Sequence, residues 1–204
     1  MDGTLVDTEP CWIAAEYALA ARYGGVWSDD DALELVGSDL LDSGRYMRDR
    51  MGIDVAPEQI VAELLDAVIE EVEHDVPWRA GARELLASLR AAGVPCALVT
   101  MSYARFAAPI VGALPPGTFD VVITGDAVDR GKPHPEPYLA AARALDVLAG
   151  DCLAIEDSRT GATSAAAAGC TVLVAPLHVD VPRGPGRVFV EDLVGLDAST
   201  RLPV

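Results

Sequence analysis

Four short groups of polar residues in this sequence could together carry out phosphate chemistry. They are Asp2-Gly3-Thr4, Thr100-Met101-Ser102, Gly131-Lys132-Pro133 and Glu156-Asp157-Ser158. Carboxylates can hold a hard cation such as Mg²⁺ or move protons, while a lysine or a hydroxyl can bind anionic phosphoryl oxygens. Taken singly, each group could instead have a purely structural role: in the order given, a turn, a helix cap, a solvated loop and an exposed acidic turn.

The elements around these groups decide whether they can act together. From Trp78 onward, short apolar segments alternate with helical patterns, which predicts a parallel sheet covered by helices on both faces. The predicted strands are Pro95–Thr100, Phe119–Asp126, Cys152–Asp157 and Thr171–Pro176. The predicted helices are 79–92, Tyr103–Leu114, Glu136–Val147 and 160–169, and a last strand or helix is expected near Val188–Leu196. Three of the four groups follow predicted strands, at the sheet edge where ligands bind.

Residues 11–77 show no strand pattern. Apolar residues at helical spacing predict four helices there, Cys11–Tyr23, Asp29–Val36, Leu40–Met51 and Pro57–His74. The sequence therefore predicts an α/β core formed by residues 1–10 and 78–204, interrupted by an all-helical unit at 11–77.

Composition narrows the possible partners. The net charge of −17 argues against nucleic acid and anionic membranes as binding partners. The four cysteines form no CxxC pair, and neither a disulfide nor a cysteine metal site is expected. A reducing cytoplasm is the expected location.

Taken in order, the four groups resemble the motifs of the haloacid dehalogenase superfamily of phosphatases and phosphomutases. The family's first motif is Asp-x-Asp-Gly-Thr, and this sequence keeps Met1-Asp2-Gly3-Thr4, followed by LVDTEP as in the β-phosphoglucomutase-like branch. Thr100 matches the second motif, Lys132 in GKPHPEPY the third, and Glu156-Asp157 in EDSRTGA the fourth. The resemblance implies a Rossmann-like parallel-sheet core with an inserted all-helical cap.

The resemblance also implies roles for single residues. Asp2 would act as general acid and base, and Lys132 would neutralise the phosphoryl oxygens. Thr100, with the polar groups of Met101 and Ser102, would bind the same oxygens. The implied cofactor is Mg²⁺, and its implied ligands are Asp157, Glu156 as a further candidate, and the backbone carbonyl of Asp2.

The family's attacking carboxylate stands one position before Met1. The sequence as given therefore lacks that residue, along with the apolar strand that carries it in the middle of the family's sheet, and two strand edges should be left unpaired. Neither Asp7 nor Glu9 is expected to reach the in-line position. Two explanations follow, a start assigned too far downstream or a truncated and inactive chain, and we favour the first.

The helical insertion is expected to choose the substrate. Candidate lining residues are Thr8, Glu9, Trp12 and Gly37, together with Ser38 and Leu40. The family's phosphoglucomutases carry His and Arg near the places of Trp12 and Leu40, which favours a phosphatase. The expected substrate is a small phosphate ester, such as a sugar phosphate, and the expected state is a monomer or weak homodimer. A β-phosphoglucomutase-type mutase and an inactive phosphate-binding protein remain as alternatives.

Overall fold

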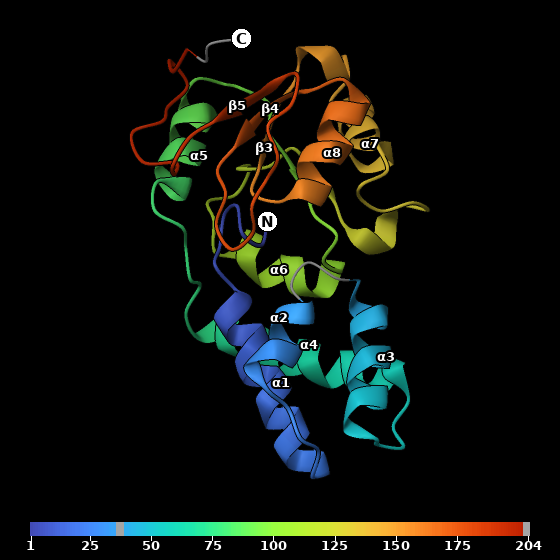
Figure 1. The fold of residues 1–204 in the computed structure, drawn as a ribbon. Coiled ribbons are helices and arrows are strands. Elements are labelled where there is room, and N and C mark those ends of the chain that lie inside the picture. The colour runs from blue at the N-terminus through green and yellow to red at the C-terminus, as the bar shows by residue number, and fades with distance from the viewer. Residues whose placement is uncertain (36–38, 202–204) are drawn as a thin grey trace. The chain divides into compact units, whose positions relative to one another are not determined.

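The computed structural model describes residues 1–35 and 39–201 (Figure 1). The chain divides into two compact units, one formed by Met1–Asp7 and Pro77–Val204 and the other by Thr8–Val76. These boundaries lie within a few residues of the predicted ones.

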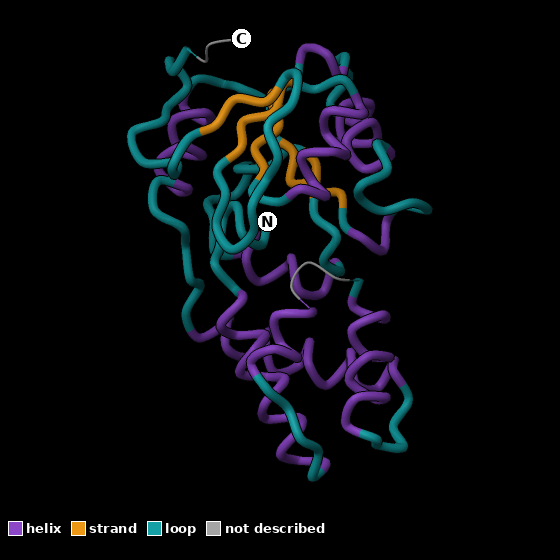
Figure 2. Tube along the Cα trace, viewed as in Figure 1, coloured by secondary structure: helices purple, strands orange, loops and turns teal. Residues whose placement is uncertain are grey.

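The unit Thr8–Val76 consists of helices in its described part (Figure 2). They are α1 (Glu9–Tyr23), α2 (Asp29–Leu35), α3 (Leu40–Met51) and α4 (Pro57–His74). The side chain of Asp39 accepts hydrogen bonds from two N–H groups at the start of α3, and left-handed glycines follow α1 and α3. Local capping therefore sets these helix ends close to the predicted ones.

The core of this unit forms around one face of α4. Six apolar residues of α4 at helical spacing are buried: Ile60, Val61, Leu64, Leu65, Val68 and Val72. Helices α1 and α3 both pack on α4. Met47 of α3 is fully buried in the same unit. The apolar stripe read from the sequence is thus the stripe that holds the unit together.

The other unit carries five short parallel strands, β1 (Ala97–Val99), β2 (Val121–Ile123), β3 (Leu153–Glu156), β4 (Thr171–Val174) and β5 (Arg187–Phe189). They form two sheets, β1-β2 and β3-β4-β5. Within the described residues no strand joins the two sheets, so β1 and β3 each have one edge without a strand neighbour. The parallel strands are therefore present in two sheets, with the two unpaired strand edges that the sequence predicted.

Helices cover these strands. They are α5 (Ala82–Ala91), α6 (Ala104–Gly112), α7 (Glu136–Ala144) and α8 (Arg159–Ala168), with short 3₁₀ turns at Gly125–Ala127 and Ala149–Asp151. Helices α7 and α8 pack side by side, and in Figure 1 α5 lies on the other side of the strands. The side chain of Ser158 caps the start of α8, and Gly169 ends it in a left-handed conformation.

Several elements differ from the prediction at their ends. Helix α6 ends at Gly112, before the predicted Leu114. Helix α7 ends at Ala144, and Asp146 just beyond it has a left-handed φ of 56°. The last expected element is a strand, β5. Element ends depend on caps and neighbours, which periodicity does not report.

All four cysteines are free thiols in this structure. Across the described ranges, no helix is long and apolar enough to span a membrane.

Candidate active site

The site begins at the first turn of the chain. The carbonyl oxygen of Met1 accepts hydrogen bonds from the N–H groups of Leu5 and Val6, at 2.7 and 3.3 Å, and this closes a tight turn. Gly3 in that turn has a φ of 69°. A Cβ at this position would lie 2.1 Å from a carboxylate oxygen of Asp157. Glycine is needed here both for its conformation and because Asp157 packs directly against it.

This turn is bonded to the second and fourth polar groups. The hydroxyl of Ser102 donates to Oδ2 of Asp2 at 2.6 Å, and the hydroxyl of Thr4 donates to Oδ1 of Asp157, also at 2.6 Å. The bonded residues are 100 and 153 positions apart in the chain. Segments far apart in sequence therefore meet at one place, at the carboxyl ends of β1 and β3.

Lys132, from the third group, is held by three acceptors. Its Nζ lies 2.6 Å from Oε1 of Glu156, 3.1 Å from the carbonyl oxygen of Val99 and 3.4 Å from the hydroxyl of Tyr138. The lysine side chain is only 10% exposed and that of Glu156 only 4%. This is a buried ion pair, so loss of either partner would leave an uncompensated charge.

Burial and charge perturb the two acids in opposite directions. Burial acts to raise the pKa of Glu156, but the charge and hydrogen bond of Lys132 outweigh it, and the net pKa is lowered. The pKa of Asp157 is raised, chiefly because burial disfavours its charged form, while the bond from Thr4 works against this. Glu156 is thus an ionised carboxylate whose charge is balanced by Lys132, whereas the negative charge that Asp157 carries when ionised is not fully balanced by a neighbouring positive charge.

The chemistry of Asp157 fits a hard cation. A divalent ion beside it would offset the burial that raises its pKa, and carboxylate and carbonyl oxygens are the donors that Mg²⁺ prefers. In the turn that follows Asp2, the hydroxyl oxygen of Thr4 lies 2.6 Å from Oδ1 of Asp157. Residues 1–35 and 39–201 contain no cluster of three or more His, Cys, Asp or Glu able to hold a metal on their own.

A family model of haloacid dehalogenase-like hydrolases matches residues 1–175. The chain belongs to this family. Among curated proteins, it is 34% identical over 187 residues to hexitol phosphatase A of Escherichia coli, covering 90% of this chain and 83% of that one. It is 30% identical over 182 residues to a phosphorylated carbohydrates phosphatase of Thermotoga maritima, covering 87% and 83% of the two chains. With these relatives, the chain is a phosphatase of the haloacid dehalogenase family.

A solved structure shares the fold. CbbY from Rhodobacter sphaeroides, in complex with phosphate, superposes with a TM-score of 0.81 at 24% identity, covering 96% of this chain and 92% of that one. This confirms the α/β core with a helical insertion that the sequence predicted.

Thr100 follows the last residue of β1 directly, with Met101 and Ser102 after it. Thr100 is buried, and its N–H donates to the carbonyl of Ile123 at 2.9 Å. The N–H of Ser102 donates to the Thr100 hydroxyl oxygen at 3.1 Å, so this N–H is already engaged inside the protein. Met101 accepts the backbone N–H of Lys132 on its sulfur, at 3.1 Å. The second and third motifs are therefore joined directly.

Three interactions of the site escaped the sequence reasoning. The guanidinium of Arg79 donates to the carbonyls of Gly3 and Ala175, which ties the first turn to the end of β4. The hydroxyl of Tyr138 donates to Glu156. His178 lies 2.7 Å from Asp7. Tyr138 closes the segment GKPHPEPY that carries the third motif, and this was the one available signal for it.

The candidate substrate-lining residues belong to the helical unit. Thr8 is buried and precedes α1, while Glu9 and Trp12 on α1 are partly exposed. Leu40, the first residue of α3, is also partly exposed. Gly37 and Ser38 lie outside the described residues.

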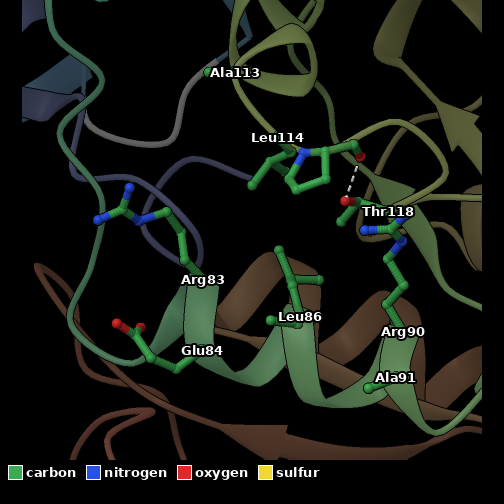
Figure 3. A pocket seen from close by; sticks show the side chains of 10 residues that line it. Arg83, Glu84, Leu86, Arg90, Ala91, Ala113, Leu114 and Thr118 are labelled. Atoms are coloured by element: carbon green, nitrogen blue, oxygen red, sulfur yellow. Dashed lines mark hydrogen bonds between the residues drawn. The ribbon is translucent and has the colours of Figure 1, made fainter.

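A pocket of about 800 Å³ lies elsewhere in the core unit (Figure 3). It is lined by residues of α5, including Arg83, Leu86 and Arg90, and by the segment 113–118. The polar groups of the four motifs do not line it, so it is separate from the candidate active site.

Proposed function

We propose that this chain hydrolyses a small phosphorylated metabolite, a sugar phosphate or a related monoester, with Mg²⁺ as cofactor. The observation that carries the proposal is the meeting of the four motifs through the bonds Ser102–Asp2, Thr4–Asp157 and Lys132–Glu156. The names of its phosphatase relatives, which act on hexitol phosphates and phosphorylated carbohydrates, support the substrate class.

In this proposal Thr100 lies beside the phosphoryl group, and Lys132, whose three N–H groups already have acceptors in the protein, attracts it through its charge. Phosphate monoesters react slowly because their anionic oxygens repel a nucleophile, so a catalyst must cancel that charge and hold the group in line. The Lys132 ammonium supplies positive charge in a buried setting, where it is weakly screened. Met101 and Ser102 complete the lining of this end of β1.

Asp157 and the backbone carbonyl of Asp2 would hold the metal. When bound, Mg²⁺ neutralises charge on the phosphoryl oxygens. Glu156 was the further candidate ligand, but its Oε1 already accepts from Lys132 and Tyr138. We therefore propose that Glu156 holds the Lys132 ammonium and that Asp157 is the metal ligand.

The reaction proceeds in two displacements, as the family resemblance implies. A carboxylate at the position before Met1 attacks phosphorus, the bond to the leaving oxygen breaks, and Asp2 protonates that oxygen to release the alcohol. Asp2 then takes a proton from water, which attacks the aspartyl phosphate, frees inorganic phosphate and restores the carboxylate.

The helical unit selects the substrate in this proposal, through Thr8, Glu9 and Trp12, with Gly37 beyond the described residues. Free thiols at all four cysteines fit the reducing cytoplasm that we propose as its location.

The test compares the chain 1–204 with a chain extended by an apolar strand ending in Phe-Asp. The extended chain should release phosphate from p-nitrophenyl phosphate and from hexitol or sugar phosphates only when Mg²⁺ is present. Two matched variants of it, the added Asp changed to Asn and Asp157→Ala, should each lose that activity.

Each other outcome points to an alternative. Conversion of β-glucose 1-phosphate to glucose 6-phosphate would favour the mutase. An extended chain that binds phosphate but turns over nothing would favour the inactive binding protein. Activity that survives Asp157→Ala unchanged would refute the proposed metal site.

A further inference from the structure

Tyr138 lies outside the four motif groups, on α7, yet it contacts two of them. Its hydroxyl donates a hydrogen bond to Oε1 of Glu156, the same oxygen that binds Nζ of Lys132. The Lys132 Nζ lies 3.4 Å from the Tyr138 hydroxyl and 5.0 Å from the centre of its ring. The three side chains therefore form a closed triangle.

The chemistry of the three groups fixes the direction of every bond in this triangle. An ammonium can only donate, an ionised carboxylate can only accept, and a phenol has a single proton. Lys132 and Tyr138 must both donate to Glu156, so the lone pairs of the Tyr138 oxygen face Lys132. One hydroxyl group thus orients the anion and also accepts from the cation.

The triangle cannot easily rearrange because each member is packed from behind. Tyr138 is 8% exposed, in a core cluster that includes Ala154, Ala162 and Val172. The other oxygen of Glu156 lies against the backbone of Gly161, so close that a Cβ there would stand 1.9 Å from it. The carboxylate therefore has a single position, with Tyr138 on one side and α8 on the other.

We propose that Tyr138 is a positioning residue for phosphoryl binding, acting through Glu156 to hold the Lys132 ammonium in place and to keep Glu156 away from the metal. The inference rests on the proposed function, since it takes Lys132 as the phosphoryl-binding cation. Without the hydroxyl, Glu156 keeps only Lys132 as a donor of the triangle, and Lys132 keeps only Glu156 and the carbonyl of Val99.

The test uses inorganic phosphate as the probe and binding as the readout. Phosphate affinity is measured by titration calorimetry in excess MgCl₂ for the chain 1–204 and for Tyr138→Phe, Lys132→Ala and Tyr46→Phe. Tyr46→Phe is the matched control, because it removes a phenol that bonds a different carboxylate, Asp31, in the helical unit. Circular dichroism confirms that each variant is folded.

We expect Tyr138→Phe to weaken phosphate binding by about ten- to a hundredfold, the loss typical of one hydrogen bond to a charged group. Lys132→Ala should abolish detectable binding, and Tyr46→Phe should leave it unchanged. If Lys132→Ala weakens binding and Tyr138→Phe does not, the role of Tyr138 is wrong while the proposed function stands. If Lys132→Ala binds phosphate normally, or the unmodified chain binds none, the proposed function itself fails.

A second measurement needs no variant at Tyr138. In the unmodified chain, the buried hydroxyl proton of Tyr138 and the ammonium protons of Lys132 should exchange slowly enough to give resolved NMR signals, and the Lys132 ¹⁵Nζ signal should shift on phosphate addition. Glu156→Gln should remove the slow exchange at both sites. Fast exchange of both groups in the unmodified chain would overturn the proposal.

Discussion

Gly161 in α8 offers a sharp test of the packing behind the active site. A Cβ at this position would stand 1.9 Å from Oε2 of Glu156, whereas ordinary contact begins near 3.4 Å. The carboxylate would have to move by about 1.5 Å, the difference between these two distances. That shift exceeds what the 2.6 Å bond to Lys132 can absorb, so the buried ion pair must break in Gly161→Ala.

The expected cost follows from two opposing terms. Breaking a buried pair costs about 3–5 kcal/mol, because a charge is left without compensation. Alanine is favoured over glycine inside a helix by about 1 kcal/mol, which offsets part of this. We therefore expect Gly161→Ala to lower the free energy of unfolding by about 2–4 kcal/mol.

Urea unfolding followed by circular dichroism measures this difference. Gly112→Ala is the matched control, because Gly112 ends α6 and a Cβ there would meet nothing within 4 Å. This control should be neutral or slightly stabilising. If Gly161→Ala proves as stable as Gly112→Ala, Glu156 can leave Lys132 at little cost, and the account of a rigid ion pair is wrong.

Two further predictions concern other buried polar groups. Glu16 on α1 is buried beside the indole of Trp27, and burial raises the pKa of Glu16 to about 7 from an ordinary value of 4.5. Between these two pH values the folded state keeps a proton on Glu16 that the unfolded state has lost. The free energy of unfolding should therefore fall as the pH rises from 4.5 to about 7. Glu16→Gln should remove that slope in unfolding measurements across the range, and above the range it should be more stable by up to about 3 kcal/mol, the free energy that corresponds to moving the pKa from 4.5 to about 7. Glu73→Gln at an exposed site should keep the slope, and an unchanged slope in Glu16→Gln would contradict the assignment. Arg79→Met should lower the free energy of unfolding by about 2 kcal/mol, because the hydrogen bonds to two backbone carbonyls are lost. It should also loosen the turn at Asp2, which would be seen as faster amide exchange at residues 4–6. Arg90→Met, on the exposed side of α5, should have neither effect. Equal exchange rates in the two arginine variants would show that Arg79 does not hold the turn.

The sequence alone determined the elements and the order of the motifs. Helix α4 spans Pro57–His74, the range that its apolar spacing predicted, because helical periodicity and an N-terminal proline are local signals. Strand β3 spans Leu153–Glu156, one residue shorter at each end than the predicted Cys152–Asp157, and its run of apolar residues is also a local signal. Family membership also followed from sequence, since the four motifs keep their residue types and their order.

Only the tertiary structure decided which side chains meet. Ser102 binds Asp2 across 100 positions and Thr4 binds Asp157 across 153, and no local pattern encodes such pairs. The same is true of Glu156, whose partner could have been a metal until the fold placed Lys132 and Tyr138 on its oxygen. The spacing of apolar residues predicts whether a segment forms a helix or a strand. The hydrogen-bond partners of its side chains depend instead on how segments that are distant in the chain pack together.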